Sequence, residues 1–114
     1  MTVEQLAEKL NIKIFAGKDG ANRQVCGCYI GDLLSWVMGR ASEGDAWLTV
    51  MGNINAIAVA TLADTACIIL TENAPLDLEA KEKADEQDVP VLVTEENSYD
   101  TAIKIYELLK AERS

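Results

Sequence analysis

The sequence predicts an α/β fold, a single layered domain with a mostly parallel central sheet. Short apolar segments of strand length alternate with segments of helical length through the second half of the chain. Residues 66–70 are apolar throughout, which is typical of a central strand covered on both faces. The 114 residues suit one domain. We therefore expect residues 1–114 to form one domain with four or five strands.

The first part of the chain predicts a helix, two strands and a second short helix. Thr2 and Gln5 have the spacing of a capping box, which predicts where the first helix begins. Asp32 has the character of an N-cap, and Gly39 of a helix end. We expect the two strands and the short helix to extend one edge of the sheet. In order, these elements are a helix over residues 2–11, strands over 12–15 and 24–30, and a helix over 32–39.

The second part of the chain predicts strands and helices in strict alternation. Asn53 and Ser98 are suited to cap two of the helices. Strands that alternate with helices of this length form βαβ units, in which neighbouring strands are parallel. The predicted strands cover residues 46–51, 66–71 and 89–94, and the helices cover 53–63, 75–87 and 98–111.

Composition narrows the function classes. The formal net charge is −9, with only 10 basic residues, whereas nucleic acids and anionic membranes attract clustered Lys and Arg. No apolar run reaches the ~20 residues of a membrane span, and the N-terminus lacks the pattern of a signal peptide. We expect a cytoplasmic protein that binds neither nucleic acid nor membrane.

The residues of common catalytic machinery are absent from the sequence. There is no histidine, which removes His-based acid/base work and Ser-His-Asp or Cys-His nucleophiles. Neither the GxxxxGK[ST] phosphate loop nor GxGxxG follows any predicted strand. We therefore predict a protein that is not an enzyme, with no catalytic residue and no cofactor.

Three cysteines, Cys26, Cys28 and Cys67, do not indicate a disulfide framework because their number is odd and no CxxC spacing occurs. A soft-metal or redox site is one interpretation. Packing of small apolar side chains is the other, and we predict no metal site.

The ends of the predicted parallel strands form a candidate ligand site. Ligands of open α/β sheets bind at the carboxyl ends of strands. Gly52 allows close backbone approach, and the free amides after Asn53 could hold an anion. Carboxylates after Thr71 and Thr94 offer an alternative, a Mg²⁺-dependent enzyme.

The final helix carries an apolar stripe wider than docking on a small sheet requires. Core packing and a dimer contact are both open interpretations of it. Trp36 and Trp47 are further candidates for the core or an interface. The stripe comprises Tyr99, Ala102, Ile103, Tyr106 and Leu109, widened by Ile105 and Leu108.

Residues 20–37, GANRQVCGCYIGDLLSWV, resemble the signature of DRTGG domains. The positions that match are Arg23, Gly27, Tyr29, Asp32, Leu33, Leu34 and Ser35. The departures are Asn22 for the acidic residue, Cys26 for the threonine and Cys28 for the second glycine. The resemblance continues along nearly the whole chain, through the turn and strand at 43–49, the alanine-rich helix at 53–60, and the strands at 66–70 and 89–92.

The resemblance implies a regulatory function. Similar domains accompany kinase/phosphorylases of the HPr carrier protein and CBS-domain pyrophosphatases, where they aid assembly or regulation while the chemistry lies elsewhere. We expect a regulatory module that forms a homodimer and binds a small, nucleotide-like ligand. The alternative from another class is a protein-interaction partner of a larger enzyme, without a ligand. The candidate ligand residues are Arg23, Tyr29, Asp32, Met51, Gly52, Asn53, Asn55 and Thr71.

Overall fold

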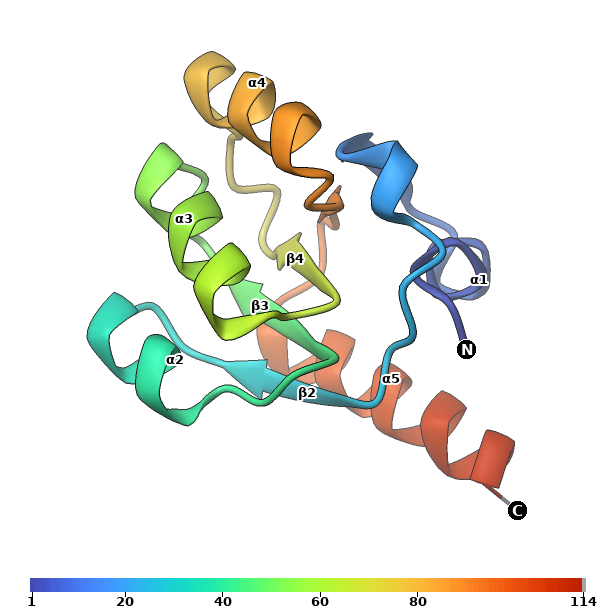
Figure 1. The fold of residues 1–114 in the computed structure, drawn as a ribbon. Helices are drawn as coiled ribbons and strands as arrows, with labels where there is room; N and C mark the ends of the chain where they lie inside the picture. Colours follow the sequence, from blue (N-terminus) through green and yellow to red (C-terminus); the bar gives the residue numbers. More distant parts are fainter. Residues whose placement is uncertain (114) are drawn as a thin grey trace.

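A five-stranded sheet forms the centre of the protein, in a computed structural model that describes residues 1–113 (Figure 1). The strand order is β1-β5-β4-β3-β2. The β2–β3, β3–β4 and β4–β5 pairs are parallel, and β1 runs antiparallel to β5. The mostly parallel α/β sheet is therefore confirmed. The strands are β1 (Lys13–Ala16), β2 (Gly27–Ile30), β3 (Asp45–Thr49), β4 (Cys67–Leu70) and β5 (Val91–Val93).

Helices cover both faces of the sheet (Figure 1). The helices α2, α3 and α4 lie on one face, and α1 and α5 lie on the other. A short 3-10 helix, η1 (Lys18–Gly20), follows β1. The α-helices are α1 (Val3–Leu10), α2 (Leu34–Arg40), α3 (Ile54–Ala63), α4 (Leu78–Gln87) and α5 (Ser98–Arg113).

The core divides into two apolar clusters, one on each face of the sheet. β4 lies in the middle of the strand order and all four of its residues are buried, as the unbroken apolar run predicted. Trp47 is 0% exposed and belongs to the core, whereas Trp36 is 52% exposed. The helix α3 is apolar on most sides, yet Leu62 on it is 70% exposed.

The prediction that the first two strands share one edge of the sheet is wrong. β1 and β2 are the two opposite edges. The chain crosses between them past the N-terminal end of α1, where Thr2 and Gln24 form an isolated bridge. Apolar alternation defines a strand and its faces but not its neighbours, so the antiparallel pairing of β1 with β5 was not visible in the pattern.

The Thr2 and Asn53 caps were predicted correctly, but the predicted Ser98 cap is wrong, because α5 begins at Ser98 and the Asp100 amide donates to Asn97 Oδ1 at 2.8 Å. The Thr2 hydroxyl accepts from the Gln5 amide and the Gln5 side chain accepts from the Thr2 amide, which completes the capping box. Asp32 is not the cap of α2, since the N-cap position is Leu33. Gly39 does not end α2 either, because the helix continues to Arg40.

None of the helices described over residues 1–113 is long and apolar enough to cross a membrane.

Candidate functional site

Asp32 joins the carboxyl ends of β2 and β3. The Thr49 hydroxyl donates to Asp32 Oδ1 at 2.6 Å, and the Val50 amide donates to the same oxygen at 3.0 Å. The indole Nε1 of Trp47 donates to the Gly31 carbonyl at 2.8 Å nearby. Thr49 is 1% exposed, so its hydroxyl needs this partner. Asp32 therefore fixes this part of the sheet rim through its side chain.

The turn from β3 to α3 is held by the chain itself. Asn53 Oδ1 accepts from the Ala56 amide at 3.0 Å, so Asn53 is the predicted N-cap. A Cβ placed on Gly52 would lie 2.0 Å from the Pro75 carbonyl oxygen. The Asp77 amide donates to the Gly52 carbonyl at 2.9 Å. The close approach that Gly52 permits is thus made by the loop before α4.

Other predicted rim residues have different surroundings. The Thr71 hydroxyl lies 2.9 Å from the Ser98 Oγ and is buried, so it links the end of β4 to the start of α5. Met51 is half-buried against the cluster under α2, α3 and α4. Asn55 is exposed on the first turn of α3.

Two loops at the rim lie against each other, as their positions after β4 and β5 predicted. The Glu72 amide donates to the Glu96 carbonyl and the Asn73 amide to the Thr94 carbonyl, both at 2.8 Å. A cavity of about 410 Å³ borders these loops and the turn between α1 and β1. The Glu96 carboxylate is paired with Lys104 at 2.6 Å. Within residues 1–113, no three or more His, Cys, Asp or Glu side chains group closely enough to hold a metal ion.

The two remaining predicted residues lie apart from the rim. Arg23 precedes β2 at the opposite end of the sheet, and its guanidinium pairs with the Asp64 carboxylate at the C-cap of α3. Tyr29 lies within β2 and packs against the α2–α4 side of the sheet. Asp32, Met51, Gly52, Asn53 and Thr71 lie at the carboxyl ends of the strands, and Arg23 does not join them.

A second region stands out at the β2 edge. Ile30 at the end of β2 is 51% exposed, and Tyr99, Ile103 and Tyr106 on α5 are 72%, 38% and 64% exposed. A cavity of about 530 Å³ lies between β2 and α5. Arg113 reaches across its end and donates from Nη2 to the Cys26 carbonyl at 2.6 Å. The apolar stripe of the final helix indicated this surface in the sequence. The part that β2 contributes could not be predicted, because it depends on the strand order.

The cysteines differ in burial. Cys26 is exposed, Cys28 is half-buried and Cys67 is buried. Burial, and then the nearby Asp45 carboxylate, raise the pKa of Cys28 to about 11. Burial, and then Cys28, raise the pKa of Cys67 to about 12. Both thiols therefore stay protonated near neutral pH, and the protonated form is neither a good nucleophile nor a good metal ligand.

Comparison with known proteins places the fold. No curated protein matches the sequence. A crystal structure of the CBS and DRTGG domains from the regulatory region of Clostridium perfringens pyrophosphatase, complexed with the activator diadenosine tetraphosphate, is similar with a TM-score of 0.72 and 14% sequence identity. The match covers 91% of this chain and 45% of that chain, so this protein spans under half of its relative's length.

The family is shown by the sequence itself. The family model described as "DRTGG domain" matches residues 5–108. This range begins in α1 and ends in α5, and therefore includes all five strands. The chain belongs to the DRTGG domain family.

Proposed function

We propose that this domain is a regulatory and assembly module, without catalytic activity of its own, that pairs with a second copy of itself. The pairing uses the β2–α5 surface, which we define as Cys28 and Ile30 of β2 with Tyr99, Ile103 and Tyr106 of α5. One observation carries the proposal: β2 is an edge strand whose apolar surroundings remain exposed.

The two edges of the sheet differ in how they are protected. Exposed strand edges invite pairing with another chain, and monomeric proteins protect them with charged residues, bulges or covering elements. β1 carries Lys13 and an irregularity between Ile14 and Ala16. β2 has the sequence GCYI and no charged residue. The unprotected edge is therefore the one beside the apolar stripe of α5.

A two-fold axis suits this surface. In a symmetric dimer the same patch meets itself, and two copies of an edge strand can meet in antiparallel orientation to continue the sheet. The five residues of the β2–α5 surface include no carboxylate, although the chain has a net charge of −9. Repulsion between copies is therefore smallest where this surface forms the contact.

The test is the molar mass in solution, measured by size-exclusion chromatography with light scattering. We expect a dimer for the native chain and a monomer for Tyr106→Glu, because a buried unpaired carboxylate opposes the contact. Leu78→Glu is the matched control, since Leu78 is 73% exposed on α4, away from the β2–α5 surface. Native chain that remains monomeric at high concentration, or equal effects of both variants, would refute this mode of assembly.

A nucleotide-like ligand is the second part of the proposal. Its support is the family membership, and the fact that the similar regulatory region of the pyrophosphatase is complexed with diadenosine tetraphosphate. The rim cavity beside Asn73 and Thr94 is the site we propose, because Lys13 borders it and ammonium groups attract phosphates. Lys104 also borders this cavity, where it is paired with Glu96.

Thermal-shift measurements with nucleotides test this ligand. A ligand that binds only the folded state adds about 2.7 kcal/mol of stability at 100 times its dissociation constant, so a clear rise in melting temperature is expected. The rise should shrink in Lys13→Gln and remain in Lys9→Gln, whose side chain lies on α1 outside the cavity lining. If no nucleotide raises the melting temperature, the nucleotide site is refuted. The result would then favour the alternative function, a protein-interaction module that has no ligand.

A further inference from the structure

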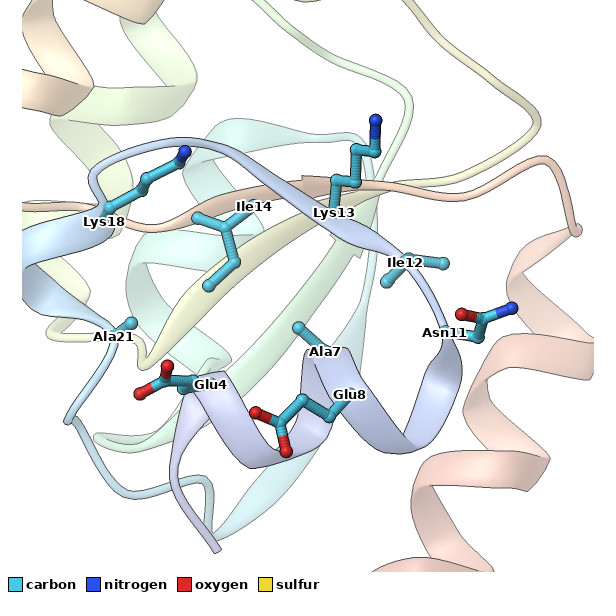
Figure 2. A pocket seen from close by; sticks show the side chains of 9 residues that line it. All are labelled: Glu4, Ala7, Glu8, Asn11, Ile12, Lys13, Ile14, Lys18 and Ala21. Carbon is cyan, nitrogen blue, oxygen red and sulfur yellow. The ribbon is translucent and has the colours of Figure 1, made fainter.

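An open cavity between α1 and β1 is bounded at its two ends by the backbone (Figure 2). At one end the Ile12 amide donates to the Ala7 carbonyl at 3.0 Å, and at the other the Glu4 amide donates to the Ala21 carbonyl at 3.0 Å. The volume is about 610 Å³, which is within the range of small-molecule sites. The walls are therefore fixed before any ligand arrives.

The floor of the cavity is apolar. Ala7 and Ala21 are buried, and Ile12 and Ile14 are half-buried and pack against the core cluster beneath α1 and α5. Figure 2 shows both isoleucines directed into the space between helix and strand. An apolar group that covered this floor would remove these side chains from water, which is favourable in proportion to the area covered.

The two sides of the opening carry opposite charges. Glu4 and Glu8 lie on α1 on one side, and Lys18 of η1 and Lys13 of β1 lie on the other, with the Lys13 side chain directed away from α1 (Figure 2). Within residues 1–113, none of these four side chains makes an ion pair within 4.0 Å. The backbone holds Glu4 and Glu8 apart from Lys18. The Gly17 amide, then Lys81 and Lys18, lower the pKa of the Asp85 carboxyl, so Lys18 also lies close to that group.

This arrangement discriminates between ligand charges. A lone anion is attracted by Lys18 but repelled by Glu4 and Glu8, and a lone cation meets the reverse. A molecule with both charges gains at both sides, because opposite charges attract and like charges repel over these short distances. Its body must be apolar to cover Ile12 and Ile14.

We propose that the cavity between α1 and β1 binds a small zwitterion with an apolar body, in the class of a free apolar amino acid or dipeptide. The ammonium group lies toward Glu4 and Glu8, and the carboxylate lies toward Lys18. This site is separate from the β2–α5 surface, and it adjoins the nucleotide site proposed at the rim, with which it shares the lining residues Asn11, Ile12 and Lys13.

Amide NMR titration of the full chain tests the proposal with four probes. L-Leucine and L-leucyl-L-leucine carry both charges, N-acetyl-leucine keeps only the carboxylate, and leucinamide keeps only the ammonium. We expect saturable shifts at Ile12, Ile14 and Ala21 with at least one zwitterion, and at least tenfold weaker binding of both singly charged probes. Equal binding of all four, or shifts with none at millimolar concentration, would overturn the proposal.

Charge variants make the test specific to the two sides of the opening. Lys18→Gln should weaken the zwitterion and make leucinamide the better ligand, whereas Glu8→Gln should favour N-acetyl-leucine. Lys9→Gln removes a charge from the same helix outside this cavity and should change neither preference. Variants that lose all binding without a change of preference would contradict the charge assignment. Failure here leaves the dimer test unaffected, because that test reads molar mass.

Discussion

At the scale of single residues, two glycines of this chain differ in whether an added methyl group would fit. A Cβ on Gly52 would lie 2.0 Å from the Pro75 carbonyl oxygen, whereas a Cβ on Gly39 would meet no atom within 4 Å. Gly52→Ala forces backbone apart and should cost about 1–3 kcal/mol of unfolding free energy. Gly39→Ala lies in α2 and should add up to ~1 kcal/mol, since alanine favours helix.

Urea denaturation of the two glycine variants measures both changes. The pair is informative because each variant adds the same methyl group, so only its surroundings differ. A Gly52→Ala protein as stable as the native chain would mean that the loop before α4 does not pack on Gly52.

The buried thiol of Cys67 predicts a loss of stability in alkali. Its pKa is raised from 9.0 to about 12 in the folded protein. Below pH 9.0 both the folded and the unfolded chain keep the proton. The contribution of the Cys67 thiol to the free energy of unfolding is then fully present. Between pH 9 and 12 the unfolded chain releases the proton more readily, so stability falls with rising pH by up to about 1.4 kcal/mol per unit.

Chemical denaturation of the native chain and of Cys67→Ala measures this loss. A range from about pH 8 to about pH 10.5 covers its onset. The variant should lose less stability per pH unit, whatever its stability at pH 8. Cys26→Ala is the control, because Cys26 is exposed, and it should keep the native slope. Parallel slopes for Cys67→Ala and the native chain would contradict the burial of this thiol.

At the scale of elements, α3 begins with two asparagines that differ in their contacts. Asn53 caps the helix through the Ala56 amide, while Asn55, two residues further along, is exposed in the first turn. Asn53→Ala should cost about 0.5–2 kcal/mol, and Asn55→Ala should have almost no effect on stability. Thermal unfolding without ligand measures this difference. Equal losses would mean that the cap contributes little to α3.

Most elements could be predicted because their signals are local. The Thr2–Gln5 capping box, the Asn53 cap and the apolar run of β4 each depend on residues a few positions apart. Asp32 shows where this fails, because its residue type is typical of a helix cap but its carboxylate accepts from Thr49 and Val50 at the end of the neighbouring strand. Partners that are distant in the sequence are set by packing, which no local spacing contains.

At the scale of the whole molecule, the order of the strands determines which of the predicted site residues lie close together. The loops after β4 and β5 were expected together and lie together, since adjacent parallel strands end at the same edge. Arg23 was grouped with the rim by its place in a motif, yet it lies at the other end of the sheet beside Asp64. The cavity between α1 and β1 was not predicted, because it arises from how a helix crosses an edge strand.

The net charge of −9 predicts how salt affects assembly through the β2–α5 surface. Two copies repel over distances beyond the contact, and the apolar contact itself has no carboxylates to lose by screening. Salt shortens the range of charge interactions from about 10 Å at ~0.1 M to about 3 Å at ~1 M. Raising NaCl over this range should therefore lower the dissociation constant of the dimer several-fold.

Sedimentation equilibrium at several NaCl concentrations measures this dependence. Glu79→Gln and Glu82→Gln together remove two negative charges from α4, far from the contact, and should strengthen the dimer at low salt but not at high salt. Repulsion through space accounts for that pattern, because nothing in the contact changes. A dimer that weakens as salt rises would instead require paired opposite charges between the two copies, and would move the contact away from the uncharged edge of β2.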